Sequence, residues 1–96
     1  MQLEQLEIFV AVARCGSFTA AAKQLYISHS STSRAVSALE DELGVRLFCR
    51  GNRVEGLTAA GETLLEEAEK LLDAAEAAKT RVKAAADREN SGEKET

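Results

Sequence analysis

Hydrophobic residues near the start of the chain recur at steps of three and four, which is the spacing of one face of an α-helix. The first such stripe consists of Leu3, Leu6, Phe9, Val10 and Ala13. It predicts an amphipathic helix from Leu3 to about Arg14. Gly16 follows directly and is predicted to end this helix.

A second, short helix is predicted next, with Ser17 as its N-cap. Its buried stripe would consist of Phe18, Ala21, Ala22 and Leu25. Only Tyr26 and Ile27 separate it from Ser28, the N-cap candidate of a third helix. The inward face of that helix would consist of Thr32, Val36, Leu39 and Leu43. Gly44 is predicted as its left-handed C-terminal residue. Two helices joined by so short a turn must cross steeply, as in a helix-turn-helix.

Beyond the third helix the pattern changes from helical to alternating. The apolar positions of this alternation are Val45, Leu47 and Leu57. Residues 50–53 supply the Gly and Asn of a tight turn, so a two-stranded hairpin is predicted over about 46–58. Arg50 and Arg53 would flank its tip, and Gly56 interrupts its second strand. Such a hairpin is a wing.

From Thr58, a further N-cap candidate, the chain is rich in Ala, Glu, Leu and Lys, which predicts one long helix to about Arg88. Its apolar positions alternate at steps of four and three, as in a coiled coil. This heptad seam consists of Leu64, Ala68, Leu71, Ala75, Ala78, Val82 and Ala85. Leu65 and Leu72 widen it near its start. Because so small a domain cannot cover the whole seam, a partner helix is predicted, held mostly by the leucines.

The chain has 96 residues, enough for one small domain. The predicted fold class is mainly α: a winged helix-turn-helix of three helices and a two-stranded wing, followed by a long dimerising linker helix. We expect a DNA-binding domain over residues 1–58 and a linker and dimerisation helix over 59–89. Residues 90–96, with Ser, Gly and alternating charge, are predicted to be a disordered tail.

The net charge of −4 at first argues against a nucleic-acid partner. Its distribution changes this picture, because six basic and six acidic residues balance through Thr58. The remaining six basic and ten acidic residues supply the whole −4. A DNA-binding surface needs only local positive charge, so the composition permits one in the first part of the chain.

Cys15 and Cys49 have no second pair and no clustered His, which indicates neither a disulfide framework nor a zinc site. We expect both to be small apolar residues in a reducing cell, with redox sensing as the less favoured alternative. The chain starts without a basic and apolar leader, so a cytoplasmic, nucleoid-associated location is expected. One His, no phosphate loop and no nucleophile with a base predict no enzyme, no cofactor and no metal.

The third helix begins with short polar residues of poor helix propensity, from Ser28 to Ser33. The free N–H groups and positive dipole at a helix N-terminus attract phosphate, and short side chains allow close approach to a groove. His29 has a ring N–H for guanine N7 or O6, and Arg34 fits guanine or phosphate. Each feature alone is as typical of a solvated helix surface. Together with the turn and the basic hairpin they follow the order of a winged helix-turn-helix.

Five stretches of the chain carry a family resemblance. They are LEIFVAVA (6–13), GSFTAAAKQL (16–25), Ser33-Arg34, LEDELGVRLF (39–48) and LTAAGETLL (57–65). Together they closely resemble the N-terminal domain of LysR-type transcriptional regulators, over roughly residues 1–88. The set is highly specific, whereas GSF or LTAAG alone would be weak.

The resemblance implies sequence-specific binding of double-stranded DNA by a homodimer that contacts inverted-repeat half-sites. It implies phosphate contacts from Ser17 and Thr19. Further DNA contacts would come from Ser28, His29, Ser30, Ser31, Ser33 and Arg34, and on the wing from Arg50 and Arg53. The linker helices would pair through Leu64, Ala68, Leu71, Leu72, Ala75, Ala78 and Val82.

The chain departs from the family pattern at three positions. Gln-Pro is common in the family where this chain has His29-Ser30, so docking is expected to survive while the preferred DNA sequence differs. Thr32 replaces the usual aliphatic residue, and its hydroxyl would need a partner if buried.

Full members of the family continue into a domain that binds a small-molecule effector. We therefore expect a DNA-binding fragment, with any effector response in the absent C-terminal domain. The alternative is a protein-interaction module whose heptad seam binds another protein's helix, which the acidic overall charge mildly favours.

Overall fold

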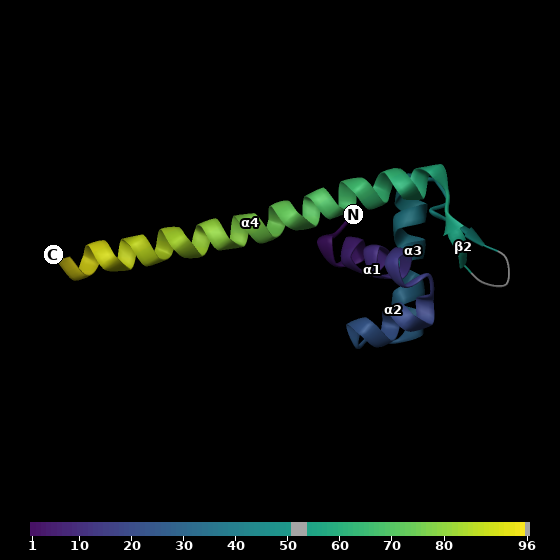
Figure 1. Cartoon of the computed structure of the whole chain (residues 1–96), viewed down its shortest axis with the longest axis horizontal. Coiled ribbons are helices and arrows are strands. Elements are labelled where there is room, and N and C mark those ends of the chain that lie inside the picture. Colours follow the sequence, from purple (N-terminus) through teal and green to yellow (C-terminus); the bar gives the residue numbers. More distant parts are fainter. Residues whose placement is uncertain (51–53, 96) are drawn as a thin grey trace.

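The computed structural model describes residues 1–50 and 54–95 (Figure 1). Its elements in chain order are α1 (Leu3–Cys15), α2 (Phe18–Leu25), α3 (His29–Leu43), β1 (Phe48–Arg50), β2 (Val54–Leu57) and α4 (Ala59–Glu95). This confirms the predicted fold class of a mainly helical domain with a two-stranded antiparallel wing. None of the helices in the described part of the chain is long and apolar enough to cross a membrane.

The N-caps predicted for the second and third helices are confirmed. The Ser17 hydroxyl accepts a hydrogen bond from the backbone N–H of Ala20 (3.1 Å). The Ser28 hydroxyl accepts one from the backbone N–H of Ser31 (3.0 Å). Each hydroxyl satisfies a backbone donor that the helix itself leaves unpaired, which fixes where α2 and α3 begin.

The turn between α2 and α3 depends on a left-handed residue. Tyr26 has a φ of 57°, and its N–H donates to the carbonyl oxygen of Lys23 (3.3 Å). The Ile27 N–H donates to the carbonyl oxygen of Ala22 (3.0 Å), and this pair of bonds is a Schellman motif. Ile27 packs against the core. The chain therefore turns sharply enough for α3 to start at His29.

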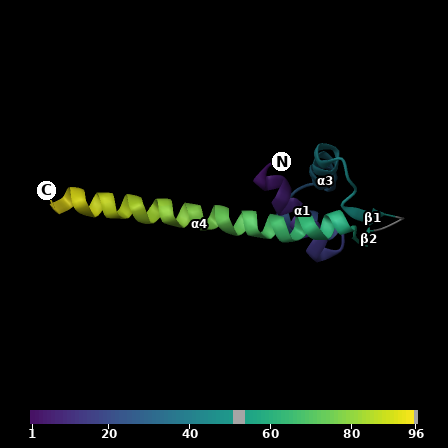
Figure 2. The same cartoon turned by 90° about the horizontal axis from the view of Figure 1, so that it is seen from above.

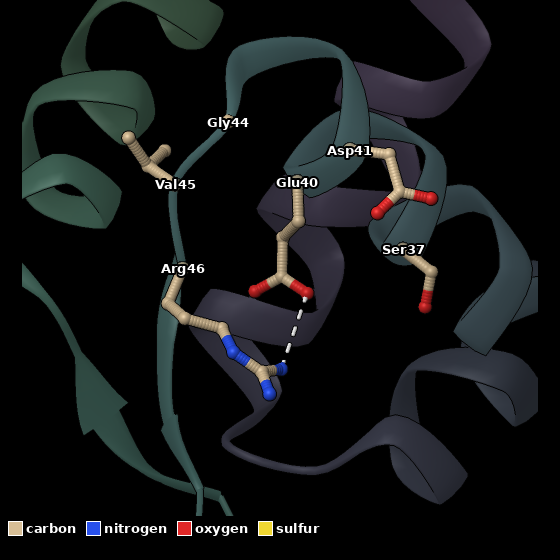
Figure 3. A pocket seen from close by; sticks show the side chains of 6 residues that line it. All are labelled: Ser37, Glu40, Asp41, Gly44, Val45 and Arg46. Atoms are coloured by element: carbon tan, nitrogen blue, oxygen red, sulfur yellow. Dashed lines mark ion pairs between the residues drawn. The ribbon is translucent and has the colours of Figure 1, made fainter.

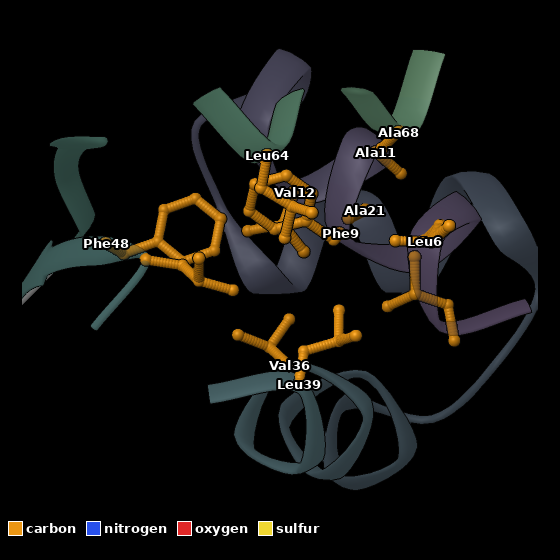
Figure 4. Close-up of a cluster of buried hydrophobic side chains, with 12 residues drawn as sticks. Leu6, Phe9, Ala11, Val12, Ala21, Val36, Leu39, Phe48, Leu64 and Ala68 are labelled. Carbon is orange, nitrogen blue, oxygen red and sulfur yellow. The ribbon is translucent and has the colours of Figure 1, made fainter. Parts of the chain in front are cut away.

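Helix α1 lies at the centre of the domain and packs against α2, α3 and α4 (Figure 4). The largest fully buried apolar side chains are Phe9, Leu6, Leu39, Leu47, Val12 and Val36. The Phe9 and Phe48 rings lie 5.4 Å apart, which connects the base of the wing to this core. Burial of this apolar surface is the main stabilising contribution to the domain.

The predicted inward face of α3 is correct at its first three positions and wrong at Leu43. Thr32, Val36 and Leu39 are fully buried, and the Thr32 hydroxyl donates to the carbonyl oxygen of Ser28 (3.0 Å), so it has the partner that burial requires. Leu43 is 41% exposed, whereas Glu40 is buried. The apolar stripe has the predicted spacing, but the core ends before the last turn of α3.

Glu40 is buried because its carboxylate joins α3 to the segment before the wing. One of its oxygens accepts a hydrogen bond from the backbone N–H of Leu47 (2.8 Å). The other lies 3.8 Å from the Arg46 guanidinium, and Figure 3 shows this pair beside a polar pocket at the C-terminal end of α3. The carboxylate thus supplies an acceptor to a buried N–H that would otherwise be unpaired.

The two strands of the wing pair antiparallel, with Phe48 opposite Leu57 and Arg50 opposite Val54. One residue of β1 lies opposite two of β2 between these pairs, which is a β-bulge. Gly56 lies in the bulge with a φ of 133°, so the predicted interruption of the second strand is a local irregularity within a continuous hairpin. The tip at residues 51–53 is outside the described residues.

The Thr58 N-cap of α4 is also confirmed. Its hydroxyl accepts from the Gly61 N–H (3.0 Å) and donates to the carbonyl oxygen of Arg46 (2.6 Å). Gly61 packs so closely on Leu47, the residue before β1, that a Cβ there would overlap the Leu47 carbonyl oxygen. Glycine is thus what lets α4 start against the base of the wing.

Helix α4 has 37 residues and projects far beyond the other elements (Figures 1 and 2). The molecule accordingly measures 65 × 26 × 19 Å. Helix α4 is described to Glu95 and so extends into residues 90–96, the stretch for which a disordered tail was predicted. Each residue added to an existing helix gains a hydrogen bond, and one interior glycine costs only about 1 kcal/mol, so Ser91 and Gly92 do not end it.

Candidate nucleic-acid interface

The first turn of α3 presents a connected group of hydroxyls. The Ser28 hydroxyl donates to the Ser31 hydroxyl (2.8 Å) and lies 3.4 Å from that of Ser30. Ser28 and Ser30 are exposed, while Ser31 is half-buried. The first turn of α3 contains no acidic residue. Because helix N-termini attract phosphate, this turn can accept an anionic ligand at close range.

The other α3 residues that are predicted to contact DNA differ in their exposure to solvent. His29, the first residue of α3, and Arg34 are exposed, and Ser33 is half-buried. They project from a helix whose opposite side is fixed in the core by Val36 and Leu39. A rigid helix with exposed donors is suited to the edges of bases in a major groove.

The start of α2 lies beside the start of α3. Phe18 is the first residue of α2, and its ring centroid is 6.2 Å from that of His29. Thr19 is exposed next to it, and Ser17 is half-buried because its hydroxyl caps the helix. Two helix N-termini therefore meet at one place, where their dipoles reinforce one another.

The segment that contains α2 and the first half of α3 carries basic but no acidic side chains, although Glu4 of α1 lines one pocket with Ser31 and Arg34. The sequence has no Asp or Glu between Glu7 and Glu40, whereas Arg14, Lys23 and Arg34 lie in that stretch. Arg14 pairs with Glu69 of α4, which leaves Lys23 and Arg34 as exposed cations of α2 and α3. The acidic residues of α3 lie in its C-terminal half, so its two ends differ in charge.

The wing arginines are only partly covered by the structure. Arg50 is the last residue of β1, and its side chain is not among those described. Arg53 lies outside the described residues. The base of the wing lies against the start of α2, since the ring centroids of Phe48 and Phe18 are 5.8 Å apart.

The predicted dimerisation residues fall into two groups. Leu64 and Ala68 are buried against the chain's own α1, where a partner helix cannot reach them (Figure 4). Leu72 and Ala75 are half-buried. Leu71 is 43% and Val82 is 68% exposed, and Ala78 is exposed too. The free part of the heptad seam therefore begins at Leu71.

Two features of this region were missed by the sequence analysis. Tyr26 is 95% exposed in a left-handed conformation, and its φ is visible only in the structure. The ring contact between Phe18 and His29 was missed because it joins two helices whose packing no local pattern reveals. Among the described residues, no group of three or more His, Cys, Asp or Glu could hold a metal ion.

Comparison with known proteins identifies the family. The family of bacterial regulatory helix-turn-helix proteins named lysR matches residues 3–62. The chain belongs to this LysR family. It is 47% identical over 85 residues to the HTH-type transcriptional regulator ClcR of Pseudomonas putida, which covers 88% of this chain and 29% of ClcR. It is 45% identical over 83 residues to the Hca operon transcriptional activator HcaR of Escherichia coli, over 86% of this chain and 28% of HcaR. The LysR-family chain thus spans less than a third of these relatives.

Solved structures of DNA-binding domains resemble this LysR-family chain throughout most of its length. The CbnR DNA-binding domain in complex with DNA is 45% identical and has a TM-score of 0.85, over 90% of this chain and 99% of that one. The BenM DNA-binding domain with the benA site 1 DNA is 39% identical and has a TM-score of 0.83, over 88% and 98%. These similarities favour the DNA-binding hypothesis over the protein-interaction alternative.

Proposed function

We propose that this LysR-family domain binds double-stranded DNA sequence-specifically as a homodimer and thereby regulates transcription. The N-terminus of α3 would enter the major groove and contact bases through Ser28, His29, Ser30, Ser31, Ser33 and Arg34. Ser17 and Thr19 would contact phosphate, and Arg50 and Arg53 would contact the backbone or the minor groove from the wing. It would act in the cytoplasm, on the nucleoid.

One observation carries this proposal. The exposed N-terminal turn of α3 meets the N-terminus of α2 in a part of the chain without acidic residues. The opposite face of α3 is fully buried at Thr32, Val36 and Leu39, so the exposed donors are held on a rigid support. Such an arrangement binds phosphate without ordering a flexible segment first, and leaves side chains free for base edges.

Dimerisation would use the free part of the heptad seam. Leu71, Ala78 and Val82 expose apolar surface along a segment of α4 that projects away from the domain (Figure 1). A second copy of this helix would remove that surface from water. We take Leu64 and Ala68 out of the predicted interface, because the chain's own core already covers them.

The test begins with selection of binding sites from random duplex DNA by the purified chain. Arg34→Ala is then compared with wild type on the selected site and on unrelated DNA. If Arg34 contacts a base, specific binding weakens by roughly 1 to 3 kcal/mol while binding to unrelated DNA changes less. Arg81→Ala is the matched control, since it removes the same charge from an exposed position on the projecting part of α4.

Two results would count against the proposed function. If selection yields no enriched sequence, the domain does not recognise DNA sequence. If Arg34→Ala and Arg81→Ala have equal effects on the selected site, α3 does not approach the bases as proposed. A loss on Arg34→Ala that is equal for selected and unrelated DNA assigns that guanidinium to phosphate instead.

A further inference from the structure

Four aromatic rings form a row from the core of the domain to its surface. The Phe9 and Phe48 centroids are 5.4 Å apart, those of Phe48 and Phe18 are 5.8 Å apart, and those of Phe18 and His29 are 6.2 Å apart. All three separations lie in the range in which aromatic pairs attract one another. The row joins α1, β1, α2 and α3, so the last ring is connected to the core through the two before it.

Exposure increases steadily along this row. Phe9 and Phe48 are buried, Phe18 is half-buried and His29 is exposed. An exposed side chain at the start of a helix normally rotates freely among its rotamers. Contact with the Phe18 ring restricts this rotation, because turning the imidazole away would give up the ring contact.

We propose that Phe18 is a positioning residue that holds the His29 imidazole in the orientation it uses on DNA. This inference rests on the proposed function. A side chain ordered before binding loses less conformational entropy when it binds, so preorganisation strengthens the complex. The bound group would be a hydrogen-bond acceptor on a base edge, such as guanine N7 or O6, which the imidazole N–H reaches from the first turn of α3.

The alternative role of Phe18 is purely structural, because it also packs against Phe48 and the core. The two roles predict losses of DNA affinity that depend differently on His29. Damage to the domain weakens DNA binding whether or not the imidazole is present. Loss of positioning has no effect once the imidazole has been removed.

A double-mutant cycle separates these roles. Phe18→Leu, His29→Ala and the double variant are compared with wild type for binding to the DNA site selected by the wild-type chain. With His29 present, Phe18→Leu is expected to weaken binding about two- to tenfold, the range of an aromatic pair. With His29→Ala as the background, the same change is expected to have little effect. Phe18→Met, whose unbranched side chain adapts more easily to the space left by the ring, is taken through the same cycle in case the leucine variant unfolds.

Two controls make the result specific. Val12→Ala also removes buried apolar volume but lies outside the ring row, so its effect on binding is expected to be equal in both backgrounds. His29 is the only histidine in the sequence, so its ring protons give unambiguous NMR signals. In the DNA-free protein these signals are expected to shift with Phe18→Leu and to stay in place with Val12→Ala.

Each outcome decides the proposal. A Phe18→Leu loss that is equal with and without His29, or imidazole signals that do not move, overturns the positioning role and leaves the proposed function intact. A wild-type chain that selects no DNA sequence overturns both. A loss that requires His29, together with a shifted imidazole signal, supports the proposal.

Discussion

Gly61 is the residue at which helix propensity and packing oppose each other most directly. Ala is a better helix former than Gly by about 1 kcal/mol, so Gly61→Ala would stabilise an isolated helix. In this domain the added Cβ overlaps the Leu47 carbonyl oxygen. We expect a loss of roughly 1 to 3 kcal/mol in the free energy of unfolding, measured by urea denaturation. A variant as stable as wild type would mean that α4 moves away from Leu47 at little cost.

The buried carboxylate of Glu40 is expected to contribute strongly to the stability of the domain. Glu40→Ala leaves the buried N–H of Leu47 without its acceptor and is expected to cost about 1 to 3 kcal/mol in unfolding free energy. Glu40→Gln retains an acceptor oxygen for this N–H and removes the negative charge that faces the exposed Arg46, a pairing that contributes little. The glutamine variant should therefore unfold at a clearly higher denaturant concentration than the alanine variant. Equal losses would assign the role of Glu40 to its charge.

Tyr26 is the described non-glycine residue with a positive φ, and its side chain is almost wholly exposed. Asn occupies the left-handed region several-fold more often than most residues do. Tyr26→Asn is therefore expected to raise the free energy of unfolding by about 0.5 kcal/mol, measured by thermal denaturation. A lower melting temperature would show instead that the tyrosine ring makes a stabilising contact.

At the scale of the elements, much of the domain follows from local pattern. The apolar stripes, the N-cap hydroxyls of Ser17, Ser28 and Thr58, and Gly44 define the helices closely. The hairpin position was also predicted, although its strands are shorter than the predicted span. These features depend on neighbours within a few residues, and such interactions are visible in a sequence.

Features set by tertiary packing were not predictable in the same way. The sequence pattern does not reveal that the core ends before Leu43, or that Glu40 is needed by the Leu47 N–H. The heptad seam likewise runs unbroken through Leu64 and Ala68, although α1 covers these two residues. For the candidate site, the position at the start of α3 was predicted, while the contact between Phe18 and His29 required the fold.

Because the heptad seam of α4 is free only from Leu71 onward, a change there is predicted to affect dimerisation. Leu71→Lys places a charge on the free part of the seam and is expected to convert the proposed homodimer to a monomer, as measured by analytical ultracentrifugation. The matched control is Leu3→Lys, since Leu3 is 47% exposed at the start of α1 and lies outside the seam. A dimer that survives Leu71→Lys would mean that the copies meet elsewhere.

Leu64→Ala is the complementary change within the same helix. Because Leu64 belongs to the domain core, it is expected to lower the free energy of unfolding by about 2 to 5 kcal/mol. Chemical denaturation followed by circular dichroism measures this loss. If Leu64→Ala changes only the dimer dissociation constant, the assignment of Leu64 to the core is wrong.

At the scale of the whole molecule, the positive region and the surplus acidic residues lie on different elements. The positive region around the starts of α2 and α3 belongs to the helix-turn-helix, while the surplus acidic residues lie on α4 and follow the domain. Helix α4 extends the molecule to 65 Å (Figure 2). The acidic charge is thereby carried away from the candidate interface, which reconciles an acidic chain with a DNA partner.

Paired recognition of DNA is tested most directly by titrating the purified chain against its selected inverted repeat over a range of salt concentrations. The comparison DNA is the same duplex with one half-site scrambled. We predict tighter binding to the intact repeat and a logarithm of affinity that falls linearly with the logarithm of salt concentration, because phosphate contacts release counterions. Equal affinity for both duplexes, with no dependence on salt, would contradict binding of DNA by a dimer.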